Sequence, residues 1–445
     1  MNRLTVLPAT RVEGSMGVPA DKSISHRAVL LAAVGEGDCL IRDCAPGAAV
    51  ASTISCVRSL GASLRRDELP LERQSEGTSG SPWQILVEGR GFDGLNEAAG
   101  PLDCGNSGTT MRTLAGLVAG RPFRTELIGD WFLSRRPMER VAEPLRLMGA
   151  GIQTTDGHAP LSITGATLSG VDYELSTPSS LVKTAILIAG LQASGQTSVV
   201  ERTPTRDHTE RLLEYMGIHV GQSPHRLVVK STRIRNPEWI EIPGDLSSAA
   251  FLLVAAAILP GSDLTITECG VNPRRAGFLD VLRRFGADVS IEGKRNLCGE
   301  PRAELRVRAA DRRPIVIGRE DVPDAIDELP LVAVLGALAP GETVVDGAQE
   351  LRVKESDRID AICTGLAAMG ADIRAHPGGF TVRGGRPLIG TEVDSAGDHR
   401  IGMALAIAGL AATGPTSISG WNAVAVSYPS FERDLAAVTV PGPGG

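Results

Sequence analysis

Aromatic residues are scarce in this sequence, because Phe, Trp and Tyr together make up 3% of 445 residues. The chain also has no excess of basic residues: 52 Asp and Glu outnumber 45 Lys and Arg and give a net charge of −7. Proteins that bind nucleic acid usually interleave aromatic side chains with a basic stripe. We therefore expect no nucleic-acid partner, although a local cluster of cations can still bind a small anion.

Long apolar runs are missing as well. The amino-terminal segment MNRLTVLPATRVEGSM lacks the apolar core of a signal peptide, and every longer apolar run contains Gly or a charge before it reaches membrane-spanning length. The seven cysteines show neither a C-x-x-C motif nor a His-paired metal spacing. The sequence thus predicts a cytoplasmic protein with no metal and no membrane contact.

What the chain has instead is a repeated helix signal. Six segments combine a polar, often Ser-bearing opening with a following run of small apolar residues that is typical of a helix. These openings occupy residues 21–27, 105–112, 177–183, 244–250, 324–330 and 397–403. Because the runs are apolar almost all the way round, we expect six helices buried at the centre of the protein.

A second repeat alternates with the first. Five times a helix ends in a bulky apolar residue and a glycine that leads into a strand, at Gly61, Gly149, Gly217, Gly286 and Gly370. Glycine fits the left-handed position after a helix. Spacings of 88, 68, 69 and 84 residues are too long for a solenoid. With FERDLAAV as a last helix, the pattern predicts six α/β units in two closed domains, with helices inside and sheets outside.

Cations gather at the helix openings. Lys22, Arg27, Arg112, Lys183 and Arg400 all lie within two turns of a predicted helix start. A helix amino terminus carries unpaired N–H groups and a partial positive charge, so a cation there is unfavourable unless an anion is bound. The sequence therefore predicts an anion-binding cleft formed where these openings meet.

Several motifs resemble those of the 5-enolpyruvylshikimate-3-phosphate synthase family. They are DKSISHRA, GNSGTTMR, GDWFLSRRPM, PTRDHTERLL, PGDLSSAAF, IDELP, LRVKESDRID and DHRIGMA, in family order over nearly the whole chain and closest to the class II bacterial subgroup. The resemblance implies an α/β (α+β) fold: a two-domain inside-out βα barrel, with three βαβαββ units and buried parallel helices in each domain. Domain one would be residues 1–20 and 244–445, domain two residues 21–243, and the active site would lie in the cleft between them.

The resemblance also implies a reaction. The enolpyruvyl group of phosphoenolpyruvate would pass to the 5-hydroxyl of shikimate 3-phosphate, and phosphate would be released, with no metal or organic cofactor. The only partners implied are these two small-molecule substrates, and the protein would be a monomer. Such chemistry needs one group that takes a proton from the hydroxyl and one that protonates the methylene carbon.

Site residues follow from the matching motifs. Catalysis would fall to Asp327 as the base for the 5-hydroxyl, Glu355 as the acid/base at the methylene carbon, and Lys22. Residues implied for shikimate 3-phosphate, besides Asp327, are Lys22, Ser23, Arg27, Ser179, Ser180, Arg206 and Lys354. Residues implied for the phosphate and carboxylate of phosphoenolpyruvate are Asn106, Gly108, Arg112, Arg136, Arg358 and Arg400, since an arginine fork binds such groups in pairs of hydrogen bonds.

The residues taken alone leave other interpretations open. Glu355 and Arg358 also fit an ordinary helix ion pair three residues apart. Asp327 and Glu328 also fit a helix cap. His399 fits a residue that orients a neighbour as well as one that moves protons.

The chain departs from the family pattern at several positions. Ala48 and Ala49 stand where an acidic pair is usual, and Leu181 stands where Gln is common. Phe132 stands where many members carry Arg, so Arg135 or Arg136 must supply that charge, and Val426 stands where some members have Lys, though class II members often lack it. Two further hypotheses follow: a related enzyme that acts on another cyclitol or sugar, and an inactive binding homologue. The peptidoglycan-precursor enolpyruvyl transferase fits less well, because the DKSISHR opening is not one of its features.

Overall fold

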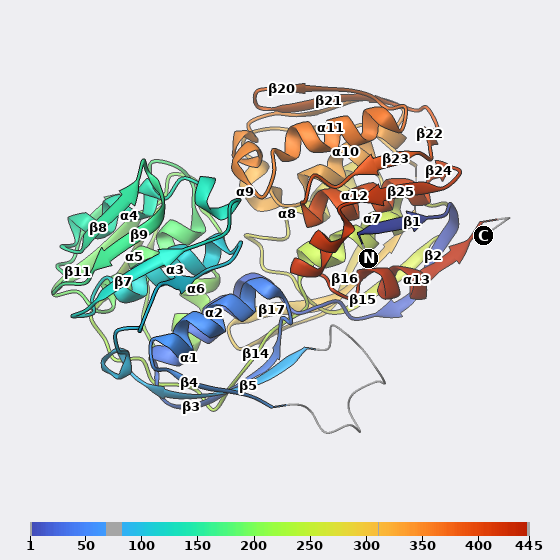
Figure 1. Cartoon of the computed structure of the whole chain (residues 1–445). Coiled ribbons are helices and arrows are strands. Elements are labelled where there is room, and N and C mark those ends of the chain that lie inside the picture. Colours follow the sequence, from blue (N-terminus) through green and yellow to red (C-terminus); the bar gives the residue numbers. More distant parts are fainter. Residues whose placement is uncertain (1, 68–81, 310, 443–445) are drawn as a thin grey trace. The chain divides into compact units, whose positions relative to one another are not determined.

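A computed structural model describes residues 2–67, 82–309 and 311–442 (Figure 1). The chain forms two compact units. Unit 1 comprises Met1–Pro19, Pro243–Asn296 and Pro301–Gly445, and unit 2 comprises Ala20–Ile242 and Leu297–Glu300. Unit 2 is therefore built from one long segment and a four-residue hairpin tip that comes from much later in the sequence.

Unit 2 contains three four-stranded sheets of the same design. The first repeat consists of β14 (Trp239–Glu241), α1 (Lys22–Val34), β3 (Glu36–Cys44), α2 (Ala48–Ser59), β4 (Ser63–Asp67) and β5 (Trp83–Arg90). The second consists of β6 (Leu102–Asp103), α3 (Gly108–Val118), β7 (Arg124–Ile128), α4 (Glu139–Leu147), β8 (Gly151–Thr155) and β9 (His158–Thr164). The third consists of β10 (Asp172–Glu174), α5 (Ser180–Gly190), β11 (Gln196–Val200), α6 (His208–Tyr215), β12 (Gly221–Ser223) and β13 (Arg226–Lys230).

Strand order is the same in all three sheets. Each begins with a parallel pair and continues with two antiparallel strands, as in β14-β3-β5-β4. Ile240 of β14 lies opposite Ile41 of β3, and Leu40 of β3 lies opposite Leu86 of β5. β14, the opening strand of the first repeat, comes from the end of the long segment Ala20–Ile242, whereas its partner β3 comes from near the start. The predicted βαβαββ repeat therefore joins the two ends of this segment.

Unit 1 repeats this plan twice. One repeat consists of β2 (Ala9–Met16), α7 (Leu246–Ile258), β15 (Asp263–Gly270), α8 (Gly277–Phe285), β16 (Asp288–Leu297) and β17 (Glu300–Arg308). The next consists of β18 (Val316–Ile317), α10 (Leu329–Leu338), β19 (Gly341–Val345), α11 (Arg358–Ala368), β20 (Asp372–His376) and β21 (Gly379–Gly384), with the short α9 (Val322–Ala325) before α10.

The last repeat of unit 1 differs from the plan. It consists of β23 (Glu392–Asp394), α12 (His399–Leu410), β25 (Thr416–Ser419), α13 (Phe431–Val438) and β26 (Thr439–Pro441). In this repeat β1 (Arg3–Val6) completes the sheet beside β25, while β26 pairs with β2. The predicted last helix at FERDLAAV is confirmed.

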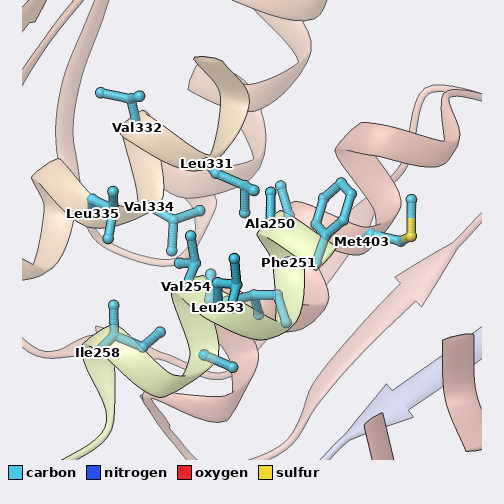
Figure 2. Packing of buried hydrophobic residues seen from close by; sticks show 14 of the residues in the cluster. Ala250, Phe251, Leu253, Val254, Ile258, Leu331, Val332, Val334, Leu335 and Met403 are labelled. Carbon is cyan, nitrogen blue, oxygen red and sulfur yellow. The ribbon is translucent and has the colours of Figure 1, made fainter. Parts of the chain in front are cut away.

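Three apolar helices form the centre of each unit, α1, α3 and α5 in unit 2 and α7, α10 and α12 in unit 1. Every residue of α7 is buried. Figure 2 shows Phe251 and Val254 of α7 turned toward side chains of α10 and α12, among them Leu331 and Met403. In unit 2, a Cβ added to Gly116 of α3 would lie 2.2 Å from the Ala185 carbonyl oxygen of α5, so only glycine permits this close approach.

The two sequence repeats are confirmed. All six openings begin buried helices, and the five predicted glycines have positive φ angles between 79° and 112°. Sheets surround the helices as expected, but among the described residues the strands form seven separate sheets, and none closes into a continuous barrel of strands.

Two further observations concern the whole chain. All seven cysteines lie in the described part of the chain, where each is buried and carries a free thiol. In the same part of the chain, each helix is too short or too polar to cross a membrane.

Candidate active site

Five of the six helix openings are capped by a side chain of the opening itself, and α10 is the exception. Asp21 accepts a hydrogen bond from the Ile24 N–H at 2.9 Å, and Ser107 accepts one from the Thr110 N–H at 3.1 Å. Ser179, Asp245 and Asp398 cap α5, α7 and α12 in the same way. Part of the polar signal in the sequence therefore serves helix capping.

The opening of α1 carries Lys22 and Ser23, both half-buried, and the buried Arg27. The Arg27 guanidinium donates to the Ser23 carbonyl at 2.9 Å and to the hydroxyls of Thr209 at 2.8 Å and Thr184 at 3.2 Å. Burial lowers the pKa of Arg27 to about 10, so the group is still charged at neutral pH. Arg27 thus ties α1 to α5 and α6 beneath the Ser23 backbone.

Two guanidinium groups converge at the opening of α3. The Arg136 Nη2 donates to the Asn106 side-chain oxygen at 3.1 Å, and the Arg112 Nη2 donates to the Pro137 carbonyl at 3.3 Å. A Cβ added to Gly108 would lie 2.9 Å from Arg112 Nη1 and 3.1 Å from Arg136 Nη1. Gly108 therefore leaves room for both cations at a helix amino terminus, a combination suited to phosphate or carboxylate.

The structure separates Arg135 from Arg136. Arg135 is exposed, and its guanidinium carbon lies 4.4 Å from the centre of the Trp131 ring. Phe132, which stands in the place of a family arginine, packs edge-to-face on Trp131. Arg136 is the buried member of the pair and the one that lies at α3.

The opening of α5 corrects one prediction. Lys183 is 1% exposed, and its ammonium lies 2.9 Å from a Glu201 oxygen and 2.7 Å from a Glu210 oxygen. Both carboxylates are buried with it. The inference that a cation at this helix start signals a bound anion is wrong for Lys183, because two protein carboxylates neutralise it. Ser180 and Arg206, in contrast, are half-buried.

In unit 1, one buried arginine binds three carboxylates. Arg358, 1% exposed, donates to Asp398 at 2.8 Å, to Glu355 at 2.6 Å and to Asp327 at 3.4 Å. Burial alone would lower the pKa of Arg358, but the charges of Asp398, Glu355 and Asp327 raise it above its ordinary value. Arg358 therefore stays charged and holds the two predicted proton-transfer groups together.

Asp327 lies among three cations. Besides Arg358, the Lys354 ammonium is 3.8 Å from one carboxylate oxygen and the Arg400 guanidinium is 3.9 Å from the other. Arg400 Nη1 also lies 3.4 Å from the Asp327 carbonyl and 4.0 Å from Glu328. The predicted residues of this unit are thus brought together around one carboxylate.

Glu355 and Glu328 do not form the ordinary helix contacts that their positions in the sequence allow. Glu355 lies outside α11, which begins at Arg358, so their contact is not an ordinary pair along a helix. Glu328 occupies the position that precedes α10, yet its carboxylate accepts a hydrogen bond from the Ser247 hydroxyl of α7 and, among the described residues, caps no N–H of α10. His399 is buried, 3.9 Å from Asp398.

Asp398 is a site residue that the sequence did not reveal. It is fully buried, caps α12 through the Arg400 N–H at 2.9 Å, and accepts hydrogen bonds from Arg358 and from the Ser356 hydroxyl at 3.2 Å. Its pairing with Arg358 joins residues at the starts of two different helices, so no local pattern in the sequence signals it.

Comparison with known proteins identifies the family. The family model described as EPSP synthase (3-phosphoshikimate 1-carboxyvinyltransferase) matches residues 6–435. The chain belongs to the EPSP synthase family. Among its relatives, a 3-phosphoshikimate 1-carboxyvinyltransferase of Shouchella clausii is 44% identical over 429 residues, which are 96% of each chain. One of Acidithiobacillus ferrooxidans is 46% identical over 431 residues, 97% of this chain and 96% of that one.

Solved structures agree with this EPSP synthase membership. EPSP synthase from Acinetobacter baumannii superposes with a TM-score of 0.85 at 39% identity and covers 99% of both chains. The enolpyruvyl transferase NikO from Streptomyces tendae superposes with a TM-score of 0.78 at 19% identity, over 99% of this chain and 100% of that one, and shows the shared fold alone. Within the described residues, no group of three or more His, Cys, Asp or Glu side chains is arranged to hold a metal ion.

Proposed function

We propose that this member of the EPSP synthase family transfers the enolpyruvyl group of phosphoenolpyruvate to the 5-hydroxyl of shikimate 3-phosphate and releases phosphate. Family membership over residues 6–435 supports the reaction class. The observation that carries the assignment of residues is the Arg358 cluster, in which one buried cation holds both Glu355 and Asp327.

The proposed proton transfers use these two carboxylates. Asp327 takes the proton of the 5-hydroxyl while the hydroxyl oxygen attacks the central carbon of phosphoenolpyruvate. At the same time, Glu355 protonates the methylene carbon. The tetrahedral adduct then expels phosphate, and Glu355 removes a proton from the methyl group to restore the double bond. Lys22 is the third proposed catalytic residue, as a cation that stabilises developing negative charge.

The proposed substrate contacts follow the charge of the openings. Arg112, Arg136, Asn106 and Gly108 at α3, together with Arg358 and Arg400, bind the carboxylate and phosphate of phosphoenolpyruvate. Residues proposed for shikimate 3-phosphate are Lys22, Ser23, Arg27, Ser179, Ser180, Arg206, Asp327 and Lys354. Each proposed anion contact comes from an arginine, a lysine or a helix amino terminus, the groups that bind such anions in proteins.

One observation supports an alternative acceptor. Leu181 lies half-buried in the first turn of α5, directly after Ser179 and Ser180. An apolar side chain at this position favours an acceptor with one fewer polar group nearby. Under this alternative, the chain performs the same transfer on another cyclitol or sugar.

The protein is proposed to be a monomer and to act in the cytoplasm. Seven buried free thiols support a reducing compartment, where disulfides rarely form. Size-exclusion chromatography with light scattering tests the monomer, and a fluorescent fusion tests the location.

Product analysis tests the proposed reaction. Purified protein is incubated with phosphoenolpyruvate and either shikimate 3-phosphate, unphosphorylated shikimate or a panel of sugar phosphates, and the products are identified by phosphorus NMR and mass spectrometry. Enolpyruvyl shikimate 3-phosphate as the main product supports the proposal. A product formed only from another acceptor supports the alternative, and binding of both substrates without any product contradicts both.

A further inference from the structure

A buried cation remains that the proposed reaction does not use. The Lys183 ammonium lies 2.9 Å from Glu201 and 2.7 Å from Glu210, and both carboxylates are buried together with the lysine. Buried ion pairs rarely add net stability over apolar residues of the same volume. The position of this pair beside a loop that carries a proposed substrate ligand suggests another role.

Glu201 extends the ion pair into the loop. Residues 201–207 connect β11 to α6 without regular secondary structure. One Glu201 oxygen binds the Lys183 ammonium, and the other accepts a hydrogen bond from the Thr205 hydroxyl. The Thr205 carbonyl in turn lies 3.4 Å from the same ammonium. Thr205 is therefore held through both its side chain and its backbone.

The end of the loop is fixed by the same part of α5. Glu210 in the first turn of α6 binds Lys183, and the hydroxyls of Thr184 and Thr209 lie 2.6 Å apart. Arg27 of α1 donates to both hydroxyls. Helices α1, α5 and α6 are thus joined by buried polar contacts at Thr209 and Glu210, three and four residues after Arg206.

We propose that Lys183, Glu201 and Thr205 form a clamp that positions Arg206 for the phosphate of the acceptor substrate. This inference rests on the proposed function, which makes Arg206 a ligand of shikimate 3-phosphate. Arg206 directly follows Thr205, so the backbone from which its long side chain extends is fixed by the clamp. A loop ordered before binding saves the entropy that would otherwise be lost when the ligand orders it. The three clamp residues are positioning residues and do not touch the substrate.

The substitution Thr205→Val tests the clamp. Valine matches threonine in shape and removes the hydrogen bond to Glu201 without adding or removing a buried charge. We expect KM for shikimate 3-phosphate to rise about fivefold to tenfold, the effect of about one hydrogen bond, while KM for phosphoenolpyruvate and kcat stay within about twofold. Thr205→Ser keeps the hydroxyl and should restore wild-type behaviour. Thr197→Val, at a buried threonine of β11, is the matched control and should change neither KM.

A second variant tests the clamp if Thr205→Val does not fold. Glu201→Gln weakens the bond to Lys183 while Glu210 still neutralises the lysine, and it should shift KM in the same direction. Titration calorimetry with shikimate 3-phosphate measures the same difference without turnover, so the clamp and the proposed reaction can fail separately. Equal effects on both substrates, a fall in kcat alone, or wild-type affinity in both folded variants would overturn the clamp.

Discussion

Arg358 donates to Glu355 at 2.6 Å and, through another nitrogen of the same guanidinium, to Asp327 at 3.4 Å. The two carboxylates proposed for proton transfer come from separate loops, one before α10 and one before α11. A single buried cation therefore sets the distance between them. The same guanidinium also donates a hydrogen bond to Asp398 at 2.8 Å.

Replacement of Glu355 should separate chemistry from binding. In Glu355→Gln the side chain keeps its size but cannot exchange a proton with the methylene carbon. We expect kcat to fall at least about 100-fold, the usual loss for a removed acid/base, while the dissociation constant for shikimate 3-phosphate changes less than about twofold. Steady-state kinetics and titration calorimetry measure the two quantities. An equal loss of affinity would assign Glu355 to substrate binding instead.

Loss of Arg358 should destabilise unit 1. Arg358→Met leaves Asp398, Glu355 and Asp327 without the cation they share, and a broken buried ion pair costs about 3–5 kcal/mol. Urea unfolding followed by circular dichroism measures this change in the free energy of unfolding. Arg3→Met is the control, since Arg3 and Glu392 form an exposed pair, and should leave stability unchanged. Equal stability of both variants would mean that the carboxylates find other partners.

A methyl group added at Gly108 should weaken the binding of phosphoenolpyruvate. The added Cβ in Gly108→Ala would lie 2.9 Å from Arg112 and 3.1 Å from Arg136, so both side-chain ends must move by a few tenths of an ångström. We expect KM for phosphoenolpyruvate to rise about fivefold with KM for shikimate 3-phosphate unchanged. Gly100→Ala, where the added Cβ meets nothing within 4 Å, is the control. A rise in KM for shikimate 3-phosphate instead would mean that α3 binds shikimate 3-phosphate and not phosphoenolpyruvate.

A fall in pH should lower the stability of unit 1, because its buried carboxylates become protonated. Burial alone would raise the pKa of Asp398 and Asp245. Arg358 with His399 at Asp398, and Arg275 with Arg400 and the Ser247 N–H at Asp245, together hold each pKa below its ordinary value. A carboxyl group whose pKa is lower in the folded protein stabilises the fold above its unfolded pKa of about 3.9 and loses this contribution as the pH falls through the folded value. We expect the free energy of unfolding to decrease steeply below about pH 4.

The variant Asp398→Asn checks this acid dependence. It should be less stable than the wild type at neutral pH and should show a shallower decline in acid, because one of the titrating groups is gone. Unfolding curves in urea between about pH 3 and pH 7 give both slopes. Parallel curves for wild type and variant would show that Asp398 does not contribute to acid unfolding.

Local rules explain what the sequence predicted well. Gly286 ends α8 because glycine adopts the left-handed conformation at low cost, and this requirement depends on neighbouring residues only. The apolar run of α7 needed nothing beyond its own composition to be recognised as central. The motif resemblance added the family, because motifs such as DKSISHRA and DHRIGMA are specific as well as local.

Long-range pairing explains what the sequence did not predict. Lys183 looked like a ligand for an anion because its partners, Glu201 and Glu210, lie on other elements of the fold. Asp398 was not predicted as a site residue, because its bond to Arg358 forms only when α11 and α12 pack together. The membership of Leu297–Glu300 in unit 2 depends on the same kind of packing.

The most direct measurement is the release of phosphate from phosphoenolpyruvate by the purified wild-type chain, with and without shikimate 3-phosphate. We predict continuous release that requires shikimate 3-phosphate and falls at least about 100-fold in Glu355→Gln. No release with that acceptor present, or release at the same rate without it, would contradict the proposed function.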